Sequence, residues 1–267
     1  MLYIVATPIG NLGEITYRAV ETLKSVDFVA AEDTRRTSEL LNKYGIKKPL
    51  ISYHKFSEKA SSAAILDRLA KGQNGALVSD AGMPLISDPG GTLVDALVEN
   101  GLEYTVISGP CACINALVLS GLDCSSFMMC GFLPDKTGER IKLMEKIADV
   151  ESTLVFYCPP HDVLENLDFL YRHLGGRKAS VVREISKLHE QVIRGRLGSF
   201  PEFTVKGEMV VVVEKAKSRA DKLSAMSVTE HVRHYMSLGY DKKEAIKKTA
   251  SDRKVAKSEI YAETLSL

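Results

Sequence analysis

The chain has 267 residues, of which 45% are hydrophobic and 26% are charged. These values are typical of a soluble globular protein. The longest apolar runs, such as Met209–Val213, are far too short to span a bilayer. The chain opens on Met1–Ala6 and leads directly into Thr7-Pro8, without the pattern of a secretory signal. The five cysteines are odd in number and form no CxxC pair, which predicts reduced thiols in a cytosolic protein without a metal site.

The net charge of +1 is distributed unevenly along the chain. From Lys215 onward there are 12 Lys and Arg against 7 Asp and Glu, a net charge of +5, which leaves 23 against 27, or −4, for the rest. A basic segment attached to a mildly acidic body indicates a polyanionic partner. A solvated helical surface explains the same charges, so both interpretations stay open here.

Strands and helices alternate in the first 120 residues. Short apolar runs predict strands over residues 2–6, 28–31, 50–54, 76–78 and 105–107, with amphipathic helices between them. This alternation predicts a parallel α/β sheet.

Polar or glycine-rich loops follow four of these strands. They cover Thr7–Gly13, Glu32–Arg35, His54–Glu58 and Ser79–Gly90. Because the carboxyl ends of parallel strands lie along one edge of a sheet, the four loops are expected to share one crevice. The loop at 79–90 contains two prolines and a Gly-Gly pair, which predicts a stiff segment suited to presenting backbone groups to a ligand.

A second domain is predicted to begin close to residue 120, after the break at Ser108–Ala112. Its predicted strands cover residues 127–132, 153–157, 179–183, 191–196 and 209–213, about half of them antiparallel, with helices around 141–147 and 163–174. The predicted domains are therefore 1–120, 121–216 and a helical tail over 217–267.

The tail contains a capping box formed by Ser227 and Glu230, a break at Gly239 and a second cap at Asp241. Three short helices with a glycine turn resemble a helix-turn-helix, and an oligomerisation hairpin fits equally well. Four lysines on adjacent turns of the second helix are spaced to follow a phosphate backbone, namely Lys242, Lys243, Lys247 and Lys248.

Common catalytic fingerprints are absent from the sequence. It has no GxGxxG after a strand, no GxxxxGK[ST] loop and no GxSxG elbow. The acidic residues Asp80, Asp88, Glu32 and Asp33 are suited to a divalent metal or to structural capping, and capping is the commoner role.

Resemblance to a known family extends over nearly the whole chain. The motifs that carry it are YIVATPIGNLGEIT (3–16), AEDTR (31–35), SYH (52–54), VSDAGMPLISDPG (78–90), GPCACINALVLSGL (109–122), GFLP-K (131–136), REISKLHE (183–190) and KGEMVVVV (206–213). They are similar to the tetrapyrrole-methylase superfamily and, within it, to the branch of ribosomal RNA small subunit methyltransferase I. The chain departs from that branch at Cys111, where serine is usual, and at Cys158 and Asp162, where glutamate and arginine are usual.

The resemblance implies two α/β domains with a cofactor cleft between them and a small C-terminal helical module. It further implies an S-adenosylmethionine-dependent homodimer that methylates the ribose 2′-hydroxyl of a cytidine in the decoding region of small-subunit (16S) ribosomal RNA. Cofactor contacts carried over by position are Pro8, Asp80, Ala81, Gly82, Met83, Ile86, Ala112, Cys113, Phe132, Tyr157, Cys158, Glu184, Gly207 and Glu208. No metal is implied.

Transfer of a methyl group to a hydroxyl requires alignment and removal of a proton. The candidates for this role, which the sequence does not rank, are Glu32, Asp33, Arg35, His54, Lys187 and Glu190.

Three other functions remain open at this point. A tetrapyrrole C-methyltransferase usually has a GAGPGD-type first loop, whereas residues 7–12 here read TPIGNL. A protein methylase of the diphthine-synthase kind has no need of a basic tail. A non-enzymatic nucleic-acid-binding protein would use the tail alone.

Overall fold

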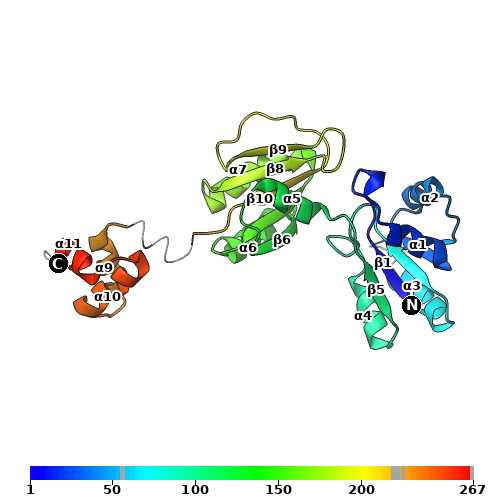
Figure 1. Cartoon of the computed structure of the whole chain (residues 1–267), viewed down its shortest axis with the longest axis horizontal. Coiled ribbons are helices and arrows are strands. Elements are labelled where there is room, and N and C mark those ends of the chain that lie inside the picture. The colour runs from blue at the N-terminus through cyan, green and yellow to red at the C-terminus, as the bar shows by residue number, and fades with distance from the viewer. Residues whose placement is uncertain (55–57, 218–222, 224–225, 265–267) are drawn as a thin grey trace. The chain divides into compact units, whose positions relative to one another are not determined.

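The computed structural model describes residues 1–54, 58–217, 223 and 226–264 (Figure 1). The chain divides into two compact units. One consists of Met1–Ile141 with Thr153–Glu214, and the other of Lys142–Ser152 with Lys215–Leu267. The first unit holds two five-stranded sheets and the second holds the helical tail, and each is described by itself.

The first sheet is entirely parallel, with strand order β3-β2-β4-β1-β5. Its strands are β1 (Leu2–Val5), β2 (Phe28–Ala31), β3 (Leu50–Ser52), β4 (Gly75–Val78) and β5 (Tyr104–Ile107). All five predicted strands are confirmed. The third ends at Ser52 and not at His54. The buried Tyr53 that follows it still donates its N–H to the Ala31 carbonyl at 2.8 Å, and its hydroxyl contacts Ser62 and Thr92 on the following helices.

Helices cover both faces of this sheet. Helices α1 (Tyr17–Ser25) and α2 (Thr34–Lys43) pack on one face through a core that includes Leu23 and Leu41. On the opposite face lie α3 (Glu58–Ala70) and α4 (Gly91–Glu99), which bury Ile65 and Leu93. A short 3-10 helix, η1 (Leu12–Glu14), lies in the β1–α1 loop. The arrangement places every β–α loop of the sheet at the carboxyl edge.

The second sheet is mixed, with strand order β6-β7-β10-β8-β9. Its strands are β6 (Phe127–Phe132), β7 (Thr153–Cys158), β8 (Lys178–Arg183), β9 (Gln191–Arg196) and β10 (Met209–Val213). The same part of the sequence contains α6 (Thr137–Ile147), α7 (Val163–Leu174) and the one-turn η2 (Pro160–Asp162). Only β6 and β7 pair in parallel, and the other three pairings are antiparallel. The prediction of a partly antiparallel sheet is confirmed.

Helix α5 (Ala112–Ser120) follows the hinge at residues 108–111 and packs on the second sheet. Its buried side chains Cys113, Ala116 and Leu117 share a core with Val155 and Val210. The predicted boundary at residue 120 assigns this helix to the first domain, while its packing associates it with the second sheet. The physical reason is that α5 is rich in apolar side chains, which pack on the apolar strands of the second sheet.

The tail forms three helices, α9 (Val228–Ser237), α10 (Lys242–Arg253) and α11 (Lys257–Glu263). The capping box of Ser227 and Glu230 is confirmed, and the Asp241 side chain accepts a hydrogen bond from the Glu244 N–H at 2.7 Å. Val232, Ile246 and Ile260, one from each helix, form the centre of a small apolar core. No helix in the described part of the chain is both long enough and apolar enough to cross a bilayer.

Candidate active site

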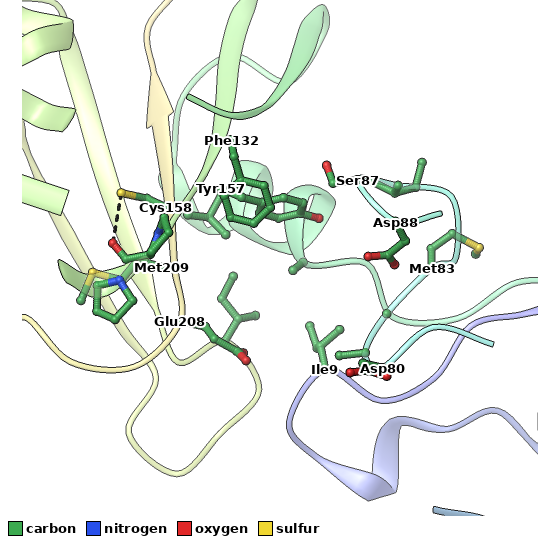
Figure 2. Close-up of a pocket in the computed structure, with 18 of the residues that line it drawn as sticks. Ile9, Asp80, Met83, Ser87, Asp88, Phe132, Tyr157, Cys158, Glu208 and Met209 are labelled. Carbon is green, nitrogen blue, oxygen red and sulfur yellow. Dashed lines mark hydrogen bonds between the residues drawn. The ribbon is translucent and has the colours of Figure 1, made fainter. Parts of the chain in front are cut away.

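A cavity of about 510 Å³ lies at the carboxyl edge of the parallel sheet. One wall comes from the β1–α1 and β4–α4 loops, and the other from α5 and the second sheet. Figure 2 shows Asp80, Met83 and Asp88 on one side and Phe132, Tyr157 and Cys158 on the other. The lining residues are Ile9, Arg36, Asp80, Ala81, Gly82, Met83, Ile86, Ser87, Asp88, Ala112, Phe132, Tyr157, Cys158, Pro159, Pro160, Ile185, Glu208, Met209 and Val210.

The β4–α4 loop is held in a narrow range of conformations. Thr7 and Gly82 exchange both backbone hydrogen bonds, at 2.8 and 3.0 Å, which ties this loop to the one after β1. Gly82 has a φ of +83°, and a Cβ there would lie 3.2 Å from Ile9 Cγ2. Leu85 and Ser87 also adopt positive φ, at 72° and 68°. Left-handed backbone at non-glycine residues costs free energy and concentrates at functional sites.

A group of carboxylates stands at the ends of β2 and β4. Asp80 accepts hydrogen bonds from the Asp33 N–H at 3.0 Å and from the Arg36 guanidinium at 3.2 Å. Burial raises the pKa of Asp88 to about 6, and the charges of Glu32 and Asp80 act in the same direction. Burial and the charge of Asp80 likewise raise the pKa of Glu32 above its ordinary value. Asp88 and Glu32 therefore hold a proton more readily than exposed carboxylates do.

Two other predicted catalytic residues on this side pair with each other. Asp33 caps α2 and forms a two-point ion pair with the exposed Arg35, at 2.9 and 3.2 Å, which holds the pKa of Asp33 down at about 2. Arg36, which the sequence reasoning missed, lines the cavity in place of Arg35. The position of Arg36 on α2 next to the Asp80 loop depends on strand order, which the sequence did not reveal. His54 lies close enough to Glu32 for its charge to lower the pKa of that residue.

Lys187 and Glu190 lie in the turn after β8. The Lys187 ammonium donates to Glu184 at 3.0 Å and to Glu208 at 3.1 Å, and the lysine stem packs on Gly10, where a Cβ would lie 2.4 Å from Lys187 Cγ. The exposed Glu190 accepts a hydrogen bond from the Ser186 N–H at 2.8 Å. In the described ranges neither residue forms a hydrogen bond or ion pair with Glu32, and Lys187 is linked to the cavity through Glu208.

The second wall is apolar and aromatic. The Phe132 and Tyr157 rings lie 5.5 Å apart, and burial raises the pKa of Tyr157 above its usual range. Behind Tyr157, the thiols of Cys111 and Cys113 are 3.5 Å apart, and all five cysteines are free. Cys158 accepts a hydrogen bond from the buried Asn166 amide at 3.2 Å.

Ten of the fourteen predicted cofactor contacts line the cavity. The other four lie beside it. Pro8 lines a neighbouring cavity, and Cys113 is buried behind Tyr157. Glu184 accepts the Glu208 N–H at 3.0 Å, and Gly207 has a φ of +83° with no room for a Cβ beside the Glu184 carboxylate. Glu184 and Gly207 therefore shape the turn that presents Glu208.

Several lining residues escaped sequence reasoning. Pro159 and Pro160 follow a predicted strand and Ser87 lies within the predicted ligand loop, so loop position after a strand was a usable signal for them. Ile9, Ile185 and Val210 are ordinary apolar residues whose place in the cavity only the packing of the two sheets determines.

The four predicted RNA-binding lysines lie on α10 in the other unit. Lys243 and Lys247 are exposed, while Lys242 and Lys248 are half-buried. The Lys248 ammonium stands 4.6 Å from the centre of the Tyr240 ring and 5.7 Å from that of Tyr235. Lys243 and Lys247 are therefore exposed cations on this helix, while Lys248 forms cation–π contacts with two tyrosine rings.

Comparison with known proteins settles the family. A sequence profile of the Tetrapyrrole (Corrin/Porphyrin) Methylases matches residues 1–201. The chain is 42% identical to ribosomal RNA small subunit methyltransferase I of Halalkalibacterium halodurans, over 97% of this chain and 93% of that protein. It is also 42% identical to the Bacillus subtilis protein of the same description, over 98% and 92% of the two chains. The chain belongs to the tetrapyrrole methylase family, in its ribosomal RNA small subunit methyltransferase I group.

Solved structures with the same fold are more distant in sequence. This methylase superposes on a diphthine synthase with a TM-score of 0.62 at 15% identity, covering 80% of this chain and 90% of that one. It superposes on the methyltransferase CobJ with a TM-score of 0.62 at 18% identity, covering 82% and 95%. These likenesses establish the fold of two α/β sheets. The chain is a methyltransferase, and its methyl donor is S-adenosylmethionine.

Proposed function

We propose that the protein methylates the ribose 2′-hydroxyl of a cytidine in the decoding region of small-subunit (16S) ribosomal RNA, as part of a homodimer acting in the cytoplasm. The observation that carries the proposal is the cavity of about 510 Å³ with a group of carboxylates at one edge. The description shared by its relatives supports the choice of RNA as acceptor. The basic tail is the second support, because the other proposed substrates of this fold, a tetrapyrrole or a protein, make no use of it.

The residues of the cavity fit S-adenosylmethionine. Asp80 and Asp88 would hold its positive sulfonium and ammonium groups, and Phe132 and Tyr157 would provide an apolar wall for its adenosine. Gly82 leaves backbone exposed where a Cβ would fill the space beside Ile9. When bound, the donor supplies a methyl group on a positively charged sulfur, which becomes a neutral thioether after transfer.

The protein's own contribution is alignment and proton removal. A bond forms between the ribose O2′ and the methyl carbon as the carbon–sulfur bond breaks, and the hydroxyl proton leaves to a base. Of the six candidates, Glu32 fits this role best, because it lies in the carboxylate group and burial makes it a stronger base than an exposed carboxylate. His54, whose charge lowers the pKa of Glu32, is the second candidate for handling that proton.

Mapping of 2′-O-methyl groups on small-subunit RNA from cells with and without the protein tests the proposed function. We expect one mark, on a cytidine of the decoding region, to vanish without the protein. Purified protein should restore it on isolated RNA or on small subunits, and a mark on a base or on a protein would overturn the proposal.

Glu32→Gln should lower the rate of RNA methylation about 100-fold while the affinity for S-adenosylmethionine stays within twofold. Asp33→Asn is the matched control one residue along the chain, and equal losses in both variants would argue against Glu32.

The homodimer is supported by exposed apolar side chains near the hinge. Val106 on β5 and Ile114 and Val118 on α5 are 45, 41 and 65% exposed. Burial of such a surface against a second copy stabilises association. Light scattering at micromolar concentration should give twice the chain mass, and Val118→Glu should lower it. A monomeric wild-type protein would contradict this part of the proposal.

A further inference from the structure

A second cavity adjoins the first at the carboxyl edge of the parallel sheet. Its volume is about 370 Å³, and the two cavities share Arg36 and Asp80 in their linings. The remaining wall comes from the β1–α1 loop, with Pro8 and Leu12, and from one face of α2, where residues 36, 40 and 43 succeed one another at helical spacing. Because Arg36 and Asp80 border both cavities, ligands bound in the two would lie close together.

Two hydrogen bonds hold the walls of this cavity. The Tyr44 hydroxyl, just beyond α2, donates to the Leu12 carbonyl at 2.7 Å. The Asn11 side chain accepts the Gly13 N–H at 3.0 Å and caps the 3-10 helix that carries Leu12. These contacts hold the β1–α1 loop beside α2, so the space between them is a formed site.

The lining combines apolar surface with two cations, Arg36 and Lys43, and two acidic side chains, Glu39 and Asp80. Pro8, Leu12 and Leu40 provide the apolar part, and Leu12 is 42% exposed. Arg36 is anchored by Asp80 at 3.2 Å, while the exposed Lys43 forms no salt bridge with any residue in the described ranges. An RNA nucleotide has groups that match this lining. Its base and ribose have apolar faces, and its phosphate is a group that arginine and lysine bind.

Methyl transfer restricts where the acceptor lies. The acceptor oxygen must approach the methyl carbon on the side opposite the sulfur, so donor and acceptor occupy adjoining spaces with only the methyl group between them. The boundary at Arg36 and Asp80 is such a place, and Asp80 is also the residue whose charge raises the pKa of Glu32. A ribose at this boundary would lie beside the carboxylate group.

We propose that this second cavity receives the target nucleotide, with Leu12 and Leu40 against its base and ribose, Lys43 on a phosphate, and Arg36 as a positioning residue at the boundary with the donor. This inference rests on the proposed function and identifies the part of the chain that holds the acceptor. It also separates two sites of RNA contact, this cavity for one nucleotide and the basic tail for the surrounding RNA.

Two variants test it in the full-length protein. Leu12→Trp fills the cavity from an exposed position, with Leu164→Trp on α7, itself 61% exposed, as its control. Lys43→Glu reverses the charge at the last turn of α2, with Lys24→Glu at the last turn of α1 as its control. The probe is a short cytidine-centred RNA trinucleotide, and calorimetry measures its affinity together with that of S-adenosylmethionine.

We expect Leu12→Trp and Lys43→Glu to weaken trinucleotide binding at least fivefold and to lower kcat/KM for ribosomal RNA at least tenfold. Cofactor affinity should stay within twofold, and both controls should behave as wild type. The inference is overturned if the wild type does not bind the trinucleotide, if the two variants bind it as well as wild type does, or if the controls lose as much. A wild type that binds the trinucleotide through Leu12 and Lys43 but adds no 2′-O-methyl mark would refute the proposed function alone.

Discussion

The α/β unit and the helical tail place charge in opposite ways. In the α/β unit the charges that matter are few, acidic and partly buried, with Asp80, Asp88 and Glu32 gathered at the edge of one sheet. In the tail they are numerous and basic, and Lys243 and Lys247 stand in solvent on α10. The tail also buries a polar network, in which His231 lies between Asp252 and Arg253 at 3.1 and 3.2 Å.

This difference indicates a division of work. The raised pKa values of the partly buried Glu32 and Asp88 suit proton transfer, and a group of acidic side chains suits the binding of a small cation. Exposed lysines on a helix suit a long polyanion, whose affinity depends on the number of phosphates contacted and on salt. Substitutions in the α/β unit are therefore expected to impair methyl transfer, and substitutions in the tail are expected to impair RNA binding.

The largest effect is expected for Gly82→Val, which attacks the α/β unit alone. The added Cβ would lie 3.2 Å from Ile9 Cγ2. The backbone at this position has a φ of +83°, which β-branched residues avoid. The dissociation constant for S-adenosylmethionine should rise about 100-fold or more in calorimetry. Gly72→Val is the matched control, because Gly72 has a φ of +81° and nothing within 4 Å of its Cβ. Equal losses in the two variants would mean that backbone strain, and not the cavity, explains the result.

The tail is expected to act on RNA alone. Lys243→Gln with Lys247→Gln removes two exposed cations, so RNA affinity at low salt should fall about tenfold. The slope of log affinity against log salt should become shallower by about 1.5, since each phosphate contact contributes 0.7–0.9. Filter binding over a salt series measures both quantities. An unchanged salt dependence of RNA affinity, or an equal loss of cofactor affinity, would contradict the separate roles of the two units.

Acid should loosen the tail before the α/β unit. Burial lowers the pKa of His231; the Asp252 carboxylate opposes this shift, while Arg253 and His234 reinforce it. The unfolded chain therefore takes up a proton near pH 6.5 before the folded tail does, and the stability of the tail falls as pH drops below that value. Hydrogen exchange in α9 and α10, corrected for intrinsic rates, should accelerate between pH 7 and 5.5, while β10 serves as the internal control. His231→Phe should flatten the change. A tail whose protection is constant over this range would contradict the prediction.

The smallest effect concerns Asp88. Its folded pKa of about 6 exceeds the unfolded value of about 3.9, so the unfolded chain loses the proton first as pH rises. The ionised carboxylate then reduces folding stability above pH 6 and has no such effect below pH 4. After allowance for solvent screening of a half-exposed group, Asp88→Asn should stabilise the protein by about 1 kcal/mol at pH 8. Thermal melts at pH 8 and pH 4 measure the difference, with the exposed Asp95→Asn as control. Stabilisation that is equal at both pH values would exclude this explanation.

Short-range pattern was sufficient for most elements. All five strands of the parallel sheet, the capping box at Ser227 and the loop at 79–90 follow from apolar runs, caps and Gly/Pro breaks, because these depend on neighbours in the chain. The family motifs likewise located ten of the residues that line the cavity.

The chain's tertiary structure decided the rest, because contacts between distant residues leave no local pattern. Strand order β3-β2-β4-β1-β5 places β2 beside β4, so that Glu32 meets Asp80 and Arg36 turns to the cavity while its neighbour Arg35 pairs with Asp33. The sequence places helix α5 at the end of the first domain, whereas its buried side chains pack on the apolar face of the second sheet. At the second cavity, the Tyr44 hydroxyl donates to the Leu12 carbonyl across 32 residues and helps to hold the β1–α1 loop beside α2. Periodicity and caps thus determined the elements, and long-range packing determined which side chains share a site.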